Sequence, residues 1–140
     1  MEYEEIKLKN VTQDDFKFLY DLLAERNPKA NISHKKMPTF EEHIQFILSK
    51  PYKEWNVLMI RNVKVGSVYL SRQNEIGIFI KKEFQNKGFG KIALDLIIKK
   101  NGNIRYLANV NPNNTDSINF FTNYGFKIIQ NTYEFDKNEK

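Results

Sequence analysis

The stretch that decides the fold is EIGIFIKKEFQNKGFGKIALDLI, residues 75–97. Its first six residues are mostly β-branched or aromatic, which predicts a buried strand. Further on, apolar residues recur at helical spacing and predict a helix from about Gly90 to Lys100. A loop with two glycines, from Gln85 to Gly90, separates the strand from the helix. The stretch therefore predicts an α/β unit in which a central strand leads through a tight loop into a packed helix.

Strands and helices alternate on both sides of this unit. Further strands are predicted at residues 6–11, 55–60, 64–71, 104–110, 126–129 and 132–135. Further helices are predicted from Thr12 to just before Asn27, from Thr39 to Lys50 and from Asn114 to Gly125. Short polar turns join the three strands between 55 and 80 into an antiparallel meander, and the strand at 104–110 follows a helix, which predicts a parallel neighbour. The predicted class is α/β (α+β), with a mixed, mostly antiparallel sheet of six to seven strands flanked by four helices.

Length and composition predict a single domain spanning residues 1–140. Apolar residues make up 41% of the chain, with 11 Phe and 7 Tyr, which is enough to fill one core. The absence of cysteine excludes thiol and disulfide chemistry. The first five residues are acidic rather than basic, and no apolar run approaches the roughly 20 residues of a membrane span. We therefore expect a soluble cytoplasmic protein with no membrane partner.

The positive charge of the chain is concentrated in one block. The formal net charge is +5, and between Lys81 and Arg105 seven basic residues face two acidic ones, a balance of 7 − 2 = +5. This block contains the glycine loop, and a concentrated positive field favours a phosphate-rich ligand. A solvated helix face is the simpler explanation of the same excess, so the charge alone does not decide the matter.

The glycine loop itself indicates a phosphate site. Two glycines, Gly88 and Gly90, allow the backbone to turn with its N–H groups inward, and a helix start adds partial positive charge. Lys87 and Lys91 add side-chain charge. A plain strand-to-helix turn is the alternative. A dinucleotide fingerprint needs a third glycine and a triphosphate loop needs a Gly-Lys-Ser/Thr ending, and the loop has neither, so NAD and ATP are disfavoured.

A nucleic-acid partner is also disfavoured. Residues 87–90, Lys-Gly-Phe-Gly, match the beginning of an RNA-recognition motif. The match ends at Lys91, which stands where a stacking aromatic is required, and the residues that follow have helical spacing.

Two linked motifs resemble the GNAT superfamily of acyl-CoA-dependent N-acetyltransferases. They are the strand at 75–80 followed by Gln85-x-x-Gly88-x-Gly90, and Asn114-x-x-Ser117-x-x-x-Phe121-x-x-x-Gly125-Phe126. The match covers residues 55–126, while the first 50 residues agree only in the order of elements. The resemblance implies an enzyme that transfers the acetyl group of acetyl-CoA directly to a primary amine, without a metal.

The resemblance also implies which residues hold the cofactor. The strand residues Ile78, Phe79 and Ile80 would offer backbone groups to the pantetheine arm. The loop residues Gln85, Asn86, Lys87, Gly88, Phe89, Gly90 and Lys91 would hold the pyrophosphate. Asn114, Ser117 and Phe121 would contact the arm from the other side. The alternatives are a buried central strand for the first set and a helix cap for Asn114.

Catalysis by direct transfer needs a base for the amine and a proton for the leaving thiolate. Glu75 is the candidate base, because it begins the central strand and resembles the position at which some family members carry a catalytic glutamate. It shares a strand face with Gly77, whose missing side chain would leave room beside it. A strand-end glutamate facing water is the alternative. The position of the family's acidic tyrosine holds Phe121, so Tyr124 is the candidate substitute. Core packing of Tyr124 and a proton taken from water are the alternatives.

The acceptor amine is less well defined. The basic loop at 29–38, with His34, lies where the family shapes its acceptor site and hints at an anionic acceptor such as a nucleotide-linked amino sugar. Asn109 stands where related enzymes acting on protein termini often have a glutamate, and its amide can orient a substrate but not accept a proton. A pattern of three segments resembles the family branch that acetylates amino sugars for surface glycans: Phe40-Glu41-Glu42-His43, Pro51-Tyr52-x-x-Trp55 and Asn74-Glu75-Ile76-Gly77.

Two other functions stay open: acetylation of protein N-termini, and a non-catalytic domain that senses acetyl-CoA. Neither His34 nor His43 has partners at metal-ligand spacing, so no metal is expected. Monomer and homodimer are both compatible with the sequence.

Overall fold

The computed structural model describes residues 5–26 and 36–138, and its centre is an antiparallel sheet of four strands in the order β1-β2-β3-β4. The strands are β1 (Ile6–Asn10), β2 (Glu54–Ile60), β3 (Val63–Leu70) and β4 (Ile76–Ile80). The helices are α1 (Phe16–Glu25), α2 (Phe40–Leu48), α3 (Phe89–Asn101) and α4 (Thr115–Tyr124). The α/β class, the four helices and the meander from β2 to β4 are thereby confirmed.

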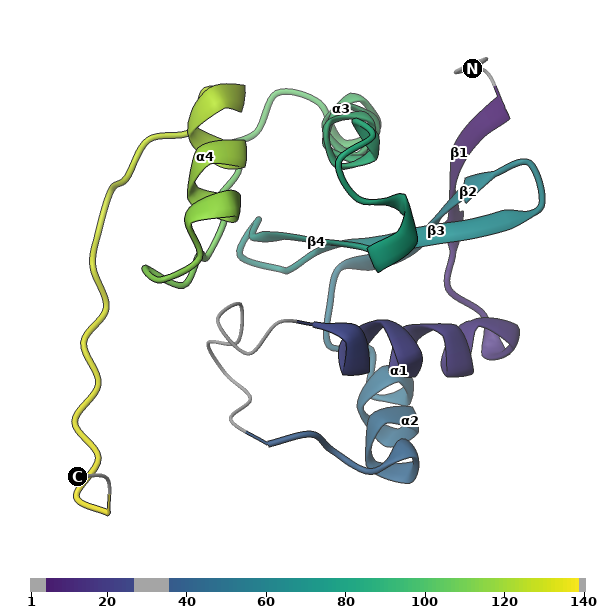
Figure 1. Ribbon diagram of the computed structural model, residues 1–140, viewed down its shortest axis with the longest axis horizontal. Helices are drawn as coiled ribbons and strands as arrows, with labels where there is room; N and C mark the ends of the chain where they lie inside the picture. Colours follow the sequence, from purple (N-terminus) through teal and green to yellow (C-terminus); the bar gives the residue numbers. More distant parts are fainter. Residues whose placement is uncertain (1–4, 27–35, 139–140) are drawn as a thin grey trace.

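Helices cover both faces of the sheet (Figure 1). α3 lies on one face, α1 and α2 lie on the other, and α4 stands beside the β4 edge. Between β4 and α3 the chain forms a short 3-10 helix, η4 (Lys82–Phe84), and then the glycine loop, so the loop lies just beyond the end of the edge strand. The layers therefore bring the loop, the β4 edge and α4 to one side of the molecule.

The main core lies between α3 and the sheet. Ala93, Leu94 and Ile97 of α3 are completely buried, as are Val68 and Leu70 of β3. These helical positions lie three and four residues apart and form one face, so burial of that face holds α3 to the sheet. A second set of buried residues belongs to α1, α2 and β2. It includes Leu19 and Leu22 of α1, Ile47 of α2 and Val57 of β2.

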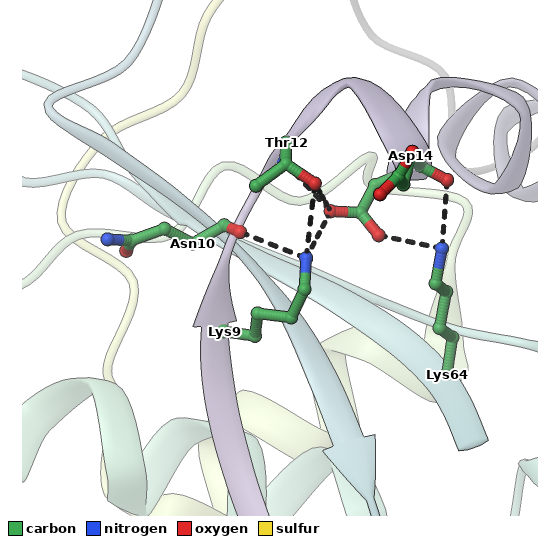
Figure 2. Close-up of polar contacts among 6 residues, drawn as sticks. Lys9, Asn10, Thr12, Asp14 and Lys64 are labelled. Carbon is green, nitrogen blue, oxygen red and sulfur yellow. Dashed lines mark hydrogen bonds and ion pairs between the residues drawn. The ribbon is translucent and has the colours of Figure 1, made fainter. Parts of the chain in front are cut away.

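A buried carboxylate joins the start of α1 to the sheet. The side chain of Asp15 is fully buried and forms ion pairs with Lys9 of β1 at 2.6 Å and with Lys64 of β3 at 2.7 Å. Figure 2 labels the two lysines, whose amino groups point toward this carboxylate. The backbone N–H of Thr12 donates a third contact at 2.8 Å. Burial on its own raises the pKa of Asp15, but the hydrogen bonds from Lys64 and Lys9 outweigh it and lower the pKa to about 2. Asp15 is therefore charged throughout the physiological range and fixes α1 on its face of the sheet.

The number of strands differs from the prediction. The described residues contain four strands rather than six to seven. Segment 104–110 pairs with the sheet in parallel at one point, Glu75 with Leu107, and residues 126–135 form no ladder. Figure 1 shows this last segment running away from α4. Tyr133 is 91% exposed there, and strand propensity without a paired neighbour does not make a strand.

No helix in the described ranges is long and apolar enough to cross a bilayer.

Candidate functional site

The glycine loop ends at the start of α3, which no side chain caps. Gly88 is the N-cap of α3 with a left-handed φ of 84°, and Asn86 is also left-handed at 64°. No side chain caps this end, and the first helical bond runs from Ile92 N–H to the Gly88 carbonyl at 3.2 Å. The N–H groups of residues 88–91 therefore have no partner within the helix. A side-chain carbon at Gly88 would have no atom within 4 Å, so nothing packs against this glycine.

Phe89 and Gly90 hold the loop in place rather than offering side chains to a ligand. Phe89 is 3% exposed and belongs to the core, where its ring meets that of Phe84. A side-chain carbon at Gly90 would lie 3.3 Å from the ring of Phe120, so this glycine allows α4 to approach α3 closely. Both residues can serve an anion only through their backbone.

The polar side chains of the loop have different surroundings. The Gln85 side-chain amide donates to the Ile80 carbonyl at 3.0 Å and so ties the loop to the end of β4. Lys91 lies 3.6 Å from Asp95 one turn further along α3. Lys87 is exposed. Lys87 thus brings charge to the loop directly, whereas the charge of Lys91 is shared with Asp95.

Beyond its first residues, the outer edge of β4 has no strand beside it in the described part of the chain, and the Ile80 carbonyl accepts from the Gln85 side chain. Ser71 N–H donates to the Glu75 carbonyl and Lys81 N–H donates to the Val65 carbonyl, both at 2.8 Å. This register turns the backbone of residues 75, 77, 79 and 81 toward β3, and that of Ile78 and Ile80 outward. The expected edge groups are therefore those of Ile78 and Ile80, while Phe79 uses its backbone on β3.

Segment 104–110 pairs with the outer edge of β4 only around Leu107. Ile76 N–H donates to the Leu107 carbonyl at 2.8 Å, and Leu107 N–H donates to Asn74 at 2.9 Å. No further parallel bridge follows among the described residues. The outward N–H of Ile78 consequently has no backbone partner in the described part of the chain. The two segments therefore pair only near the start of β4, and the glycine loop lies at the other end of this strand, where they no longer pair.

The start of α4 is capped as predicted. The side-chain oxygen of Asn114 accepts from Ser117 N–H at 3.2 Å, which leaves the Asn114 side-chain NH₂ available to another partner. Ser117 and Phe121 are half-buried, and the Phe121 ring packs edge-on against Phe120 and Phe126.

Glu75 is held from two sides. The Ser71 hydroxyl donates to Glu75 Oε1 at 3.1 Å, and the Asn109 side-chain amide donates to Glu75 Oε2 at 2.7 Å. Ser71 is 7% exposed, and its oxygen also accepts from the Glu75 N–H at 3.0 Å. The structure thus brings two predicted site residues together, and adds Ser71, which the sequence did not single out. All donors to this carboxylate are neutral, so its negative charge is not cancelled by them.

The space beside Gly77 is filled, contrary to expectation. Tyr69 pairs with Gly77 across the strands, and its ring occupies the position that a side chain at 77 would take. The Tyr52 ring stacks on Tyr69 at 3.8 Å between centroids, almost parallel at 5°. Burial raises the pKa of both phenols, that of Tyr52 well above its usual range. An aromatic residue opposite a strand glycine is the signal that could have identified Tyr69.

Tyr124 faces α3. Its hydroxyl donates to Asp95 Oδ1 at 2.6 Å, and burial together with Asp95 raises the pKa of Tyr124 to about 12. Its proton is therefore committed to a carboxylate on the neighbouring helix. Of the two residues predicted to bind the acceptor, His34 lies outside the described residues, and Asn109 donates its side-chain amide to the Glu75 carboxylate.

Another hollow lies apart from these residues. A groove of about 900 Å³ runs between α2 and the start of β2, lined by Phe16, Ile47, Leu48 and Trp55 among others. None of the predicted site residues that the structure describes lines it. Within the described ranges no group of three or more acidic or histidine side chains is placed to hold a metal ion.

The sequence matches the family model "Acetyltransferase (GNAT) family" over residues 16–126, so the chain belongs to this family of acetyltransferases. No curated protein sequence matches it significantly.

Solved structures share the fold over most of the chain. A domain from Methanocaldococcus jannaschii DSM 2661 is 28% identical with a TM-score of 0.79, covering 92% of each chain. Spermidine N-acetyltransferase from Vibrio cholerae, crystallised with CoA and spermine, is 19% identical with a TM-score of 0.73, covering 87% of this chain and 80% of its own. An aminoglycoside N-acetyltransferase in complex with CoA is 16% identical with a TM-score of 0.71, covering 94% of each.

Proposed function

We propose that this protein binds acetyl-CoA and transfers the acetyl group directly to the primary amine of a small acceptor. The observation that carries the proposal is the open outer edge of β4, which has the uncapped start of α3 at one end and Glu75 at the other. An extended ligand with a diphosphate at one end and a thioester at the other matches that arrangement.

The protein has suitable groups for both the pyrophosphate and the pantetheine arm of acetyl-CoA. At the loop, the N–H groups of residues 88–91 and the side chain of Lys87 would hold the pyrophosphate, because helix starts favour anions. Along β4, the outward backbone groups of Ile78 and Ile80 would pair with the pantetheine amides as a neighbouring strand does. The Asn114 amide would close the other side. Acetyl-CoA supplies an already activated acyl group, so positioning is the main task of the protein.

Glu75 would accept the proton of the incoming amine. An amine arrives mostly as its ammonium form near pH 7 and must lose a proton before it can attack. The hydrogen bonds from Ser71 and Asn109 restrict the carboxylate to one orientation. The outward N–H of Ile78 would donate to the thioester carbonyl as charge develops on it.

Neither of the two residues considered as proton donors to the leaving thiolate has a free hydroxyl. Phe121 lacks a hydroxyl, and the Tyr124 hydroxyl is bound to Asp95. We infer that the proton comes from water, with Tyr124 as the alternative donor. The same two facts favour the second candidate function, a domain that binds acetyl-CoA without turnover.

The acceptor we rank first is an amino sugar, with a nucleotide-linked sugar as the leading example, and a protein N-terminus ranks next. Structural neighbours act on different amines, including spermidine, aminoglycosides and a ribosomal protein N-terminus, so the fold does not select among them. The test is thiol release from acetyl-CoA in the presence of amino sugars, polyamines and peptides. Release above the hydrolysis rate with any of them supports the enzyme, and stoichiometric binding without release supports the sensor.

A further inference from the structure

The segment that follows α4, residues 126–135, carries an apolar face that is exposed. Side chains alternate along an extended chain, so Ile129, Tyr133 and Phe135 lie on one face, and the other face between 128 and 135 is polar apart from Ile128. Phe135 is 87% exposed and Ile128 is 81% exposed. Such alternation is typical of a strand with one face against a core, and a row of exposed apolar side chains marks a surface that binds another. The segment has the pattern of a strand without its sheet.

This segment does not turn back on its own chain as a tight hairpin. A two-residue hairpin turn needs positive φ angles, and none of residues 126–135 has one. Phe126 N–H donates to the Phe121 carbonyl at 2.9 Å, which fixes where the segment begins, and from there it runs away from α4 (Figure 1). Within the described ranges, no backbone hydrogen bond joins residues 127–133 to another segment. The segment is therefore placed to reach a surface outside the domain that carries it.

Segment 104–110 has a matching backbone edge on its outer side. Both backbone groups of Leu107 are bonded toward β4, to Ile76 and Asn74. Backbone direction alternates along a strand, so Tyr106 and Ala108 turn their backbone groups outward, where no backbone partner meets them among the described residues. The Tyr106 side chain packs against the core that α3 covers. A strand added here would therefore have one face on the same side as this core.

The apolar side chains of α4 are incompletely covered. None of its residues is fully buried, although the helix carries Ile118, Phe120 and Phe121. Ile118 is 37% exposed. A helix in a folded domain normally buries one apolar stripe against a neighbouring layer. A strand on the outer side of segment 104–110 would extend the sheet toward α4 and supply that layer.

We propose that two copies of this protein exchange residues 126–135, each of which adds as a strand to the outer side of segment 104–110 in the other copy. Tyr133 and Phe135 then pack against α4 of that copy. A foreign partner on the same edge would leave the apolar face of 126–135 exposed, whereas a two-fold exchange covers both features in both copies. Both segments have the usual length of a strand. The added strand lies beside Asn109, whose amide orients Glu75, but the inference does not depend on acetyl transfer.

The mass of the protein in solution, measured by light scattering at micromolar concentration, tests the exchange. We expect twice the 16.6 kDa of one chain. Phe135→Lys should weaken the dimer by roughly 30-fold or more in Kd, the effect of losing an aromatic anchor at an interface. Leu48→Lys is the matched control, because Leu48 is also an exposed apolar residue but lines the groove beside α2. It should leave the dimer intact.

Three results overturn the inference. The first is a monomeric wild-type protein, which leaves the segment to some other partner. The second is a dimer that persists in Phe135→Lys. The third is a dimer that Leu48→Lys dissociates, which places the contact at the groove.

Hydrogen exchange of the backbone amides separates exchange between copies from folding within one chain. Amides of residues 127–133 should be protected in the wild-type dimer and lose that protection in Phe135→Lys, while those of α3 stay protected in both and show that the variant is folded. Tyr133→Lys changes the same face and should behave alike. Protection of residues 127–133 in a monomeric protein means that the segment pairs within its own chain, and contradicts the exchange. None of these measurements uses acetyl-CoA, so they stand whether or not the proposed function holds.

Discussion

The side-chain amide of Asn109 donates a 2.7 Å hydrogen bond to Oε2 of Glu75, joining the segment after α3 to the start of β4. The parallel bridge between Glu75 and Leu107 brings the two residues together, and Leu107 lies two positions before Asn109. Ser71 holds the other carboxylate oxygen. The candidate base is thus oriented by two neutral groups from two different segments.

Replacing Glu75 by Gln should lower kcat by about 10²- to 10⁴-fold, the usual contribution of a general base. The amide keeps the shape of the side chain but cannot take a proton. The measurement is thiol release across pH together with acetyl-CoA stabilisation of the variant, which should match the wild type. A rate equal to that of the wild type at every pH contradicts the assignment.

Replacing Asn109 by Asp should move the acidic limb of the pH–rate profile to higher pH. The change places a second carboxylate at hydrogen-bond distance from Glu75, and two close carboxylates do not readily ionise together. Asn113→Asp, an exposed change in the same loop, is the control and should leave the profile in place. Identical profiles for both variants would show that Asn109 does not act through Glu75.

Replacing Tyr124 by Phe should lower the melting temperature and leave kcat nearly unchanged. The change removes the hydroxyl that joins α4 to Asp95 of α3, a bond worth about 1 kcal/mol. A loss of kcat beyond about 10²-fold, with normal acetyl-CoA stabilisation, would instead make Tyr124 the proton donor. Phe121→Tyr is the complementary variant, and it should raise kcat if thiolate protonation limits the rate.

Replacing Asp15 by Asn should destabilise the protein at neutral pH and much less in acid. The pKa of Asp15 is lowered to about 2 in the folded state, below the unfolded value of about 3.9. The ionised carboxylate therefore contributes stability above pH 4, of order 2–3 kcal/mol, and this is lost as the pH falls from about 4 to 2. Urea unfolding of both proteins between pH 7 and pH 2 measures the difference. A gap that stays constant down to pH 2 argues against this role, and Asp14→Asn, an exposed neighbour, should show almost no gap.

The local features of the fold could be predicted from sequence because each has a local cause. Thr39 accepts from Glu42 N–H at 3.1 Å as its capping box predicts, and the glycine loop starts α3 one residue earlier than expected. Residues 126–135 were predicted as strands from their composition. A strand also needs a hydrogen-bonded neighbour, which composition does not supply.

The candidate site was predicted only where one segment forms it. Glu75 and the glycine loop lie at the two ends of a single stretch, so the sequence alone could place them at the start of β4 and in the turn that follows it. Ser71 and Tyr69 reach the site through strand register, so their spacing in the sequence carries no signal. The meeting of Asn109 with Glu75 likewise depends on a parallel bridge between segments more than 30 residues apart.

The most direct test of acetyl-CoA binding is a thermal-unfolding scan with and without acetyl-CoA, using ATP and a Gly88→Glu variant as controls. A ligand at about 100 times its Kd adds roughly 2.7 kcal/mol, which for a chain of this length raises the midpoint by about 3 to 6 °C. We expect that shift with acetyl-CoA, not with ATP, and not in Gly88→Glu, which places a negatively charged side chain at the N-cap of α3. No shift at millimolar acetyl-CoA would contradict the proposed function.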